Sequence, residues 1–201
     1  MTTPSKLFIF SAASGTGKTS LAKALVERHA DIAFSVSHTT RAPRPGEQHG
    51  VHYYFVSRQE FDRMVAAGEF VEHATVFGNS YGTSKRAIDD QLRAGKRVIL
   101  DIDWQGARAI KAWRPDAVSV FILPPSRAAL RERLINRQQD SAEIIDRRMR
   151  EAVAEMSHYK EFDRLVVNDD FEAALADLAA ILHGRPEQAR PLRIDIAALL
   201  A

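Results

Sequence analysis

A glycine-rich segment near the start of the chain, "SAASGTGKTS" from residue 11, has the residue types and spacing of a phosphate-binding loop. The usual pattern is G-x-x-x-x-G-K-[ST], in which the lysine reaches the terminal phosphates and the hydroxyl ligates Mg²⁺. Gly17, Lys18 and Thr19 fit this pattern, whereas Ala12 replaces the first glycine. Gly15 and Gly17 allow the backbone to turn its N–H groups toward a phosphate. The alternative is an ordinary glycine turn beside a surface lysine, and the position between a strand and a helix favours the loop.

Two carboxylates that could take part in the chemistry, Asp101 and Asp103, lie at the end of the apolar segment "RVILDID". A buried strand that ends in a carboxylate beside a phosphate loop can hold Mg²⁺, directly or through water. Solvated acids at a strand end are common, so this segment alone would favour an ordinary strand end. Together with the loop, it favours a metal-binding role for Asp101.

Phosphoryl transfer also needs cations around the transferred group, whose oxygens carry negative charge. The segment from 127 to 150 holds seven arginines: Arg127, Arg131, Arg133, Arg137, Arg147, Arg148 and Arg150. We expect most of them to lie on solvated helix faces, where nearby acids balance them. One or two should face the phosphates, but spacing alone does not say which.

The elements that must position these residues are apolar strand-like runs alternating with helical ones. Buried strands are predicted in "KLFIFS", "RVILDID", "VSVFILPP" and "RLVVND". Helices are predicted in "KTSLAKALVERHA", "RQEFDRMVAAGEF", "SKRAIDDQLRAG" with Gly95 as its C-cap, residues 126 to 160 with a break near "QQDS", and "FEAALADLAAILHG". This alternation predicts an α/β fold with a parallel sheet covered by helices on both sides.

The segment from about 37 to 83 has a different residue pattern from the rest of the chain. "RAPRPGEQHG" is too rich in proline and glycine for regular structure, and "VHYYFVS" alternates like a half-exposed strand. We therefore expect an insertion with its own small sheet. The tail from residue 185 is expected to be peripheral, although "IDIAALLA" could pack or form a contact surface between copies.

Composition limits the class of protein. The chain has 201 residues, of which 45% are hydrophobic and 27% charged, as in a soluble globular domain. It has no cysteine, which excludes disulfides and thiolate metal sites and favours the cytosol. No run approaches the roughly 18 apolar residues that span a membrane. The net charge of +2 is compatible with a small phosphorylated ligand.

Several strings in order make the signal specific: "SGTGKTSL", "VSHTTRAPRPGE", "YYF", "FVEHATVFGNSYGTS", "LDIDWQG", "ILPPS" and "NDD". Together they resemble guanylate kinase of the bacterial type, a nucleoside monophosphate kinase with a P-loop, over most of the chain. The family usually has proline where this chain has Ala13, and some members have glycine at Ala12. Neither change removes a phosphate-contacting amide.

The resemblance implies a P-loop NTPase-type parallel sheet, an inserted small mixed α/β region that binds GMP, and a helical lid. It implies transfer of the ATP γ-phosphate to GMP, which yields GDP and ADP, with Mg²⁺ as cofactor. The partners would be ATP and GMP, with dGMP also expected, and no nucleic acid or membrane; the location would be cytoplasmic, and a homo-oligomer is compatible.

The resemblance also assigns residues by position. The catalytic set is Lys18, Arg41, Arg137 and Arg148. The ATP set is Ala12, Ala13, Ser14, Gly15, Thr16, Gly17, Lys18, Thr19, Ser20 and Asn168. The GMP set is Ser37, Arg41, Arg44, Glu47, Tyr53, Glu72, Tyr81, Thr83 and Asp103, and the metal set is Thr19 and Asp101. The implied regions are core with P-loop (1–36), GMP-binding region (37–83), core (84–125), lid and flanking helices (126–160), core (161–184) and tail (185–201).

The chemistry of guanine agrees with this set. Guanine offers N1–H and an exocyclic amine as neighbouring donors, which the carboxylate of Glu72 can accept, and O6 as an acceptor for the hydroxyl of Ser37 or Thr83. Adenine presents the opposite pattern and would leave buried polar groups unpaired. Taken singly, each of these residues is better explained as structural, but seven matches in register favour the base-reading set.

Two other functions stay open. Some domains that resemble guanylate kinase are interaction modules without catalysis, and a kinase of another small phosphate acceptor could share the fold. The presence of Lys18 and Thr19 together with the acid pair argues against the first, and the intact base-reading set argues against the second.

Overall fold

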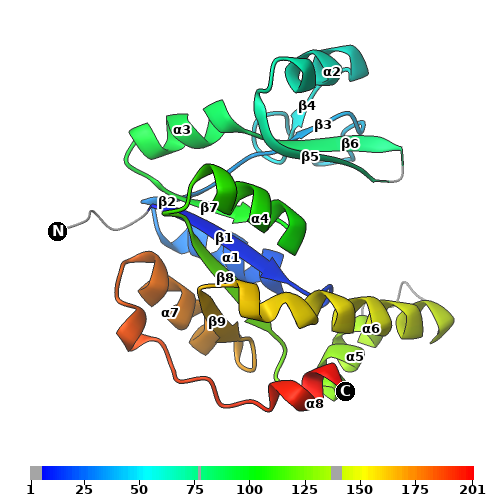
Figure 1. The fold of residues 1–201 in the computed structure, drawn as a ribbon, viewed down its shortest axis with the longest axis vertical. Coiled ribbons are helices and arrows are strands. Elements are labelled where there is room, and N and C mark those ends of the chain that lie inside the picture. The colour runs from blue at the N-terminus through cyan, green and yellow to red at the C-terminus, as the bar shows by residue number, and fades with distance from the viewer. Residues whose placement is uncertain (1–5, 77, 137–141) are drawn as a thin grey trace.

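The computed structural model describes residues 6–76, 78–136 and 142–201. Its centre is a five-stranded sheet in the order β2-β7-β1-β8-β9, in which every neighbouring pair is parallel (Figure 1). The strands are β1 (Leu7–Ala12), β2 (Ile32–Phe34), β7 (Arg97–Asp101), β8 (Val118–Leu123) and β9 (Arg164–Val167). The prediction of an α/β fold with a parallel sheet is confirmed.

Alternate residues of β1 face two separate cores, because side chains of a strand point to opposite faces in turn. Leu7 and Ile9 join one core, and Phe8 and Phe10 join the other. The first core is covered by α3 (Lys85–Arg93), α4 (Trp104–Trp113), α5 (Arg127–Asn136) and α6 (Ala142–Met156). The second is covered by α1 (Lys18–Arg28) and α7 (Phe171–Leu182). Burial on both faces explains why these strands read as continuous apolar runs.

A second, four-stranded sheet in the order β4-β3-β6-β5 lies beyond α3 and α4, at the top of Figure 1. Its elements are β3 (His38–Thr39), β4 (Tyr54–Phe55), α2 (Arg58–Ala66), β5 (Phe70–Val76) and β6 (Asn79–Ser84). The pairing is mixed, since β3 and β4 are parallel and the other pairs antiparallel. Phe61, Met64 and Phe70 give this sheet its own small core.

The structure corrects two sequence-based expectations. The strand predicted over "VHYYFVS" is limited to Tyr54–Phe55, because the preceding residues form turns in which Val51 donates to the Gln48 carbonyl and Gly50 to the Tyr53 carbonyl. The prediction also lacked α4, which begins directly after "LDID". Asp103 caps this helix by accepting a hydrogen bond from the Gly106 N–H at 2.8 Å.

The tail is attached to the body of the protein. Arg190 donates from its backbone and from Nε to the carboxylate of the buried Asp177, both at 2.8 Å. The chain then passes to α8 (Ile196–Leu200), which packs against α6 and buries Leu199 in the first core. The alternative that "IDIAALLA" packs is therefore confirmed for α8. Gly95, predicted as the C-cap of α3, lies one residue past the observed C-cap Ala94 and has a φ of 80°, the left-handed conformation common at that position. None of the helices in the described ranges combines the length and apolarity needed to cross a bilayer.

We predict that Leu199→Ala lowers the free energy of unfolding by about 2–4 kcal/mol, because truncating a buried leucine loses transfer energy and leaves a cavity. Leu199 is 2% exposed, whereas Leu192 in the same tail is 40% exposed. Leu192→Ala is therefore the matched control and should cost less than about 1 kcal/mol. Urea denaturation of the two variants measures the difference. Equal stabilities would mean that α8 adds nothing to the core.

Candidate active site

The phosphate loop needs glycine at two positions, and Ala12 is not one of them. Ala12 is the last residue of β1 and pairs with Ile122, so its backbone is extended and any residue fits there. Gly15 and Gly17 have φ values of 90° and 96°, in the left-handed region that favours glycine. The mismatch to the usual pattern therefore falls where the backbone tolerates it. The helix α1 begins at Lys18, as the sequence predicts, so its free N–H groups face the loop.

Asp101 holds the two polar side chains that open α1. Its Oδ1 lies 2.6 Å from Lys18 Nζ, and its Oδ2 accepts a hydrogen bond from Thr19 Oγ1 at 2.8 Å. Lys18 also donates to the carbonyl of Ile102 at 3.1 Å. The cause is the register of the parallel sheet, which pairs Asp101 with Phe10 of β1 and so brings the end of β7 beside the loop.

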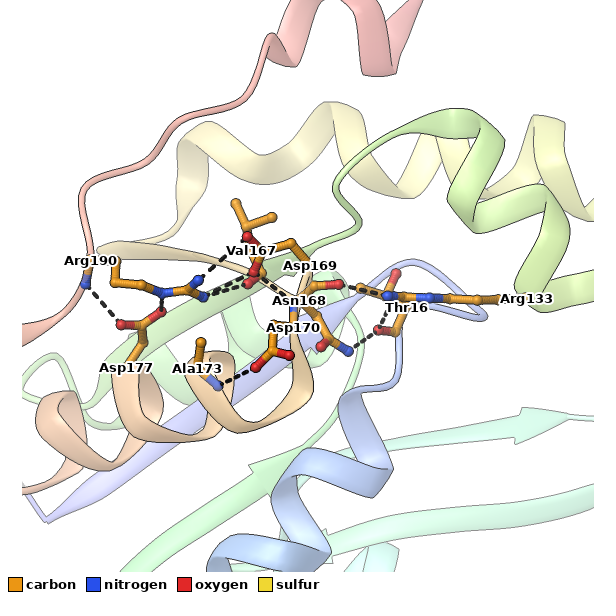
Figure 2. A network of polar contacts seen from close by, with 9 residues as sticks. All are labelled: Thr16, Arg133, Val167, Asn168, Asp169, Asp170, Ala173, Asp177 and Arg190. Atoms are coloured by element: carbon orange, nitrogen blue, oxygen red, sulfur yellow. Dashed lines mark hydrogen bonds and ion pairs between the residues drawn. The ribbon is translucent and has the colours of Figure 1, made fainter.

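A polar network fixes the other side of the loop (Figure 2). The carbonyl of Thr16 accepts from Asn168 Nδ2 at 2.7 Å and from Arg133 Nη1 at 3.2 Å, and Arg133 Nη2 donates to the Asn168 carbonyl at 2.7 Å. A Cβ on Gly17 would lie 2.6 Å from Asn168 Nδ2. Position 17 therefore requires glycine both for its positive φ and for the space that Asn168 occupies. Asn168 thus contacts the loop backbone, and its predicted contact with the ATP base stays a prediction. Arg133 was absent from the predicted site, since spacing could not single it out.

The helix α6 reaches the mouth of the loop through two side chains. Arg148 Nη2 donates to Ser14 Oγ at 2.7 Å, and the Glu155 carboxylate accepts the Ser14 N–H at 3.1 Å. Burial raises the pKa of Glu155, although the Ser14 N–H and Lys18 oppose the shift. Glu155 was missed by the sequence analysis; it lies seven residues after Arg148, a spacing that places both on one helix face. Arg137, the other predicted lid arginine, lies outside the described residues.

On the second sheet, Arg41 is held by an acid and flanked by two phenols. Arg41 Nη2 donates to both carboxylate oxygens of Glu47, at 2.8 and 2.9 Å. The Arg41 guanidinium and the Arg44 backbone N–H together lower the pKa of Glu47 to about 2. The Arg41 guanidinium carbon lies 5.5 Å from the centroid of the Tyr53 ring, which lies 6.0 Å from that of Tyr81. The structure therefore brings together five of the predicted GMP-site residues, Arg44 through its backbone.

Glu72 and Thr83 face each other across the hairpin of β5 and β6, where they are register partners. The buried Thr83 hydroxyl donates a hydrogen bond to Glu72 Oε1. Burial raises the pKa of Glu72; the Thr83 hydrogen bond lowers it, and the charge of Asp103 raises it further. Since a hydroxyl has one proton, Thr83 must turn away from Glu72 before it can donate to a base oxygen.

The remaining predicted residues contribute less to this arrangement. Ser37 is half-buried just before β3, and its carbonyl accepts the Tyr54 N–H at 2.9 Å. Arg44 and Ser20 are exposed. The two halves of the site are joined because α4 packs on β5. As a result Asp103 acts on the pKa of Glu72, and Asp101 adds to the effect of burial in raising the pKa of Tyr53.

The arrangement can therefore bind phosphates at one end and read a polar base at the other. The loop amides and Lys18 favour anions, and the oxygens of Thr19 and Asp101 are hard donors that suit a divalent cation such as Mg²⁺. The half-buried carboxylate of Glu72 favours a ligand with N–H donors.

Comparison with known proteins gives a consistent result. The family model described as guanylate kinase matches residues 4–185. The guanylate kinase of Alkalilimnicola ehrlichii is 57% identical over 192 residues, which cover 94% of this chain and 95% of that protein. The guanylate kinase of Pseudomonas fluorescens Pf0-1 is 55% identical over 195 residues, which cover 97% and 95%. The crystal structure of guanylate kinase from Anaplasma phagocytophilum aligns with a TM-score of 0.68 at 37% identity, covering 96% of this chain and 92% of that one.

We predict that Glu155→Gln tightens ATP binding by about 2–10-fold, the scale of 0.5–1.5 kcal/mol for one contact. The amide keeps an acceptor for the Ser14 N–H but removes a negative charge that faces incoming phosphates. The dissociation constant is measured by calorimetry without acceptor. Glu151→Gln is the control, because Glu151 lies one turn earlier on α6 and is exposed.

The advantage of the Gln variant should shrink as pH falls. The pKa of Glu155 is raised, so acid protonates it and makes the wild-type side chain neutral as well. Unchanged or weaker ATP binding by Glu155→Gln at neutral pH would show that the carboxylate does not compete with phosphate.

Proposed function

The chain belongs to the guanylate kinase family and phosphorylates GMP to GDP with ATP, and we propose that its two sheets divide this reaction between them. In this proposal, the phosphate loop and the arginines of α5 and α6 bind ATP, and the second sheet binds GMP. The observation that carries the proposal is the contact of Asp101 with both Lys18 and Thr19, beside a second sheet that holds a half-buried carboxylate.

Thr19 and Asp101 would hold Mg²⁺ between the loop and the ATP phosphates. Their donors suit it, since both are oxygens and they lie 2.8 Å apart. When bound, the ion neutralises charge on the phosphate oxygens and orients the γ-phosphate. All other contributions come from the side chains and amides of the chain itself.

When ATP binds, the Lys18 ammonium would leave the Asp101 carboxylate and contact the phosphates. Its ammonium and the N–H groups from Gly15 to Thr19 would then stabilise negative charge on the β- and γ-phosphates. Arg148, which contacts Ser14 at the loop mouth, is proposed to contact the γ-phosphate, with Arg137 as its partner in the lid. The fixed Thr16 carbonyl supports this scheme, because a loop held in place needs no reorganisation during transfer.

Arg41, Tyr53 and Tyr81 would hold the GMP phosphate, with Arg44 as a further cation. Glu47 keeps the Arg41 guanidinium in place by accepting two hydrogen bonds from Nη2, and the Ala42 carbonyl accepts one from Nη1. The Nε–H and the second N–H of Nη1 would serve a phosphate. The phenol O–H groups of the two tyrosines would donate to the same phosphate. Fixed in this way, the phosphate of GMP would present an oxygen nucleophile to the γ-phosphate.

Glu72 would read guanine by accepting its N1–H and its amine. Its raised pKa supports this, because a half-buried carboxylate gains most when a ligand supplies the donors that water no longer supplies. Thr83 and Ser37 are proposed to donate to O6, and Asp103 to approach the base from α4.

We extend the proposal to dGMP as a second acceptor and to a cytoplasmic location, which the absence of cysteine favours. The region boundaries given above stay predictions.

The interaction-module alternative has lost its support, because the family assignment and the relatives agree with an enzyme and the chain keeps Lys18, Thr19 and Asp101.

Replacing Lys18 tests the phosphate side. Lys18→Ala should lower kcat by roughly 10²-fold or more, the effect of losing one electrostatic donor at the transition state. Lys23→Ala is the matched control, because Lys23 is an exposed lysine on the same helix. Steady-state ADP release with GMP, together with circular dichroism to verify folding, measures the effect. Near-normal turnover of folded Lys18→Ala would remove the loop from the mechanism.

Replacing Glu72 tests base selection. Glu72→Gln should lower kcat/KM for GMP by about 10–100-fold, the scale of one or two charged hydrogen bonds at 1.5–3 kcal/mol each. AMP should change little, because the amide can turn its NH₂ toward adenine N1. Glu69→Gln is the control, since Glu69 pairs with Arg63 at the start of β5. An unchanged GMP-to-AMP ratio in Glu72→Gln would show that Glu72 does not read the base.

Thr83→Val tests how Glu72 is kept charged. The Thr83 hydrogen bond lowers the pKa of Glu72, so its loss should raise that pKa further above the ordinary value. A carboxyl with a higher pKa is protonated at a higher pH and then carries no charge for guanine. The acid side of the pH profile of kcat/KM for GMP should therefore move to higher pH. A parallel loss at every pH would assign Thr83 to direct contact with the base instead.

A further inference from the structure

Three polar side chains meet at the end of the central sheet opposite the phosphate loop. The helices α1 and α7 follow strands of a parallel sheet and run back against them, so both end at the amino edge of the strands. His29 is the C-cap of α1, and His183 is the C-cap of α7. Asp31 immediately precedes β2. The two helices pack on each other, and this packing brings their last residues together.

These residues have the types and separation of metal ligands. One donor atom from each of His29, Asp31 and His183 lies within 4.8 Å of the other two. Within this group, His183 Nε2 and Asp31 Oδ2 are 3.4 Å apart. Two ligands bound about 2.0–2.1 Å from one tetrahedral ion are about 3.3 Å apart. The pair is thus already spaced as two ligands of one ion would be, and the His29 donor lies within 4.8 Å of both.

The tautomer of His183 points a lone pair at Asp31. His183 Nδ1 lies 2.7 Å from the carbonyl oxygen of Ala179. A carbonyl only accepts hydrogen bonds, so Nδ1 must carry the proton. The Nε2 of a neutral ring in this tautomer presents its lone pair to the Asp31 carboxylate oxygen, and a cation bound between the two atoms would remove their repulsion. A backbone carbonyl on the second nitrogen is also how metal-binding histidines are commonly oriented.

Arg97 holds Asp31 in place, and the ends of two helices offset the positive charge of its guanidinium. The Arg97 N–H donates to the Asp31 carbonyl at 2.8 Å, and Arg97 Nε lies 3.1 Å from Asp31 Oδ2. The Ile32 N–H donates to the His29 carbonyl at 3.0 Å. This hydrogen bond closes the turn that contains Asp31 and connects α1 to β2. The C-termini of two helices, each with partial negative charge, end beside these side chains.

We propose that His29, Asp31 and His183 form a binding site for a divalent transition-metal ion of the zinc class, with water as the fourth ligand. Two imidazoles and one carboxylate suit Zn²⁺, whereas Mg²⁺ requires oxygen ligands. The site is separate from the reaction, because α1 spans about 16 Å between the loop and His29 at the helical rise per residue. A bound ion would join the ends of α1 and α7 to the start of β2 and so stabilise the folded chain by linkage.

The site is tested by zinc titration of the untagged full-length protein against a chromophoric chelator. One Zn²⁺ per chain should bind, and His29→Gln and His183→Gln should each weaken binding by about 10-fold or more. His158→Gln is the matched control, because His158 also contacts a carboxylate, Glu161, at 2.7 Å. It should leave the zinc affinity unchanged. Equal zinc affinity in the wild type, His29→Gln and His183→Gln would overturn the proposal.

A second readout does not depend on the variants. Zn²⁺ should raise the melting temperature of the wild type, excess chelator should reverse the rise, and Mg²⁺ at millimolar concentration should not replace it. Co²⁺ added to the wild type should give the strong visible absorption of a tetrahedral nitrogen-ligated ion. A wild type that shows neither the rise nor the absorption would mean that the proton of an imidazolium, and not a metal, separates His183 from Asp31, and this too would overturn the proposal.

Discussion

The carboxylate of Asp101 is the contact on which the rest of the site depends. It receives the ammonium of Lys18 and the hydroxyl of Thr19 at once, and both side chains are fixed on the first turn of α1. The Lys18 and Asp101 side chains are only 18% and 22% exposed, so neither charge has full access to water and each needs a partner. The pair therefore holds Lys18 beside the loop, where in the proposed scheme phosphates would replace Asp101 as its partner.

This contact constrains the sheet. Asp101 can reach the loop only if β7 lies next to β1 with Asp101 opposite Phe10, and the order β2-β7-β1-β8-β9 provides this neighbour. On the other side, β8 and β9 bring Asn168 beside Thr16, since the Asn168 N–H donates to the carbonyl of Leu123 at the end of β8. The loop is therefore held from both neighbouring strands. Its amides are oriented before any ligand arrives, and preorganised donors of this kind stabilise a transition state most effectively.

The sequence predicts those parts of the molecule whose signals are local. The apolar runs of β1, β7 and β8 and the glycines of the loop are such signals, because burial on two faces and a left-handed backbone each restrict the residue types directly. The helix α4 was missed although Asp103 is an ordinary N-cap residue, because the acid pair was interpreted only as a ligand set.

Contacts between distant segments could not be predicted in this way. Arg133 and Asn168 are 35 residues apart, and each meets Thr16 more than 100 residues away in the chain. Nothing in the spacing of seven arginines distinguishes Arg133, which holds the loop, from Arg131, which pairs with Asp146 at 2.6 Å. The same holds for Glu155, whose partner Ser14 is 141 residues distant. Such pairs depend on how α5 and α6 pack on the sheet, and helix periodicity indicates a face but not its neighbour.

Two half-buried carboxylates, Glu72 and Glu155, show how one physical effect can serve opposite ends of a site. Burial raises the pKa of both, because it removes the water that stabilises their charge. In the proposed scheme, guanine brings N–H donors to Glu72 and so restores the lost stabilisation, which lowers its pKa on binding. The phosphates of ATP bring negative charge toward Glu155 and raise its pKa further. Proton linkage therefore has opposite signs for the two substrates: occupation of the base site favours release of a proton from Glu72, and occupation of the loop favours its uptake by Glu155.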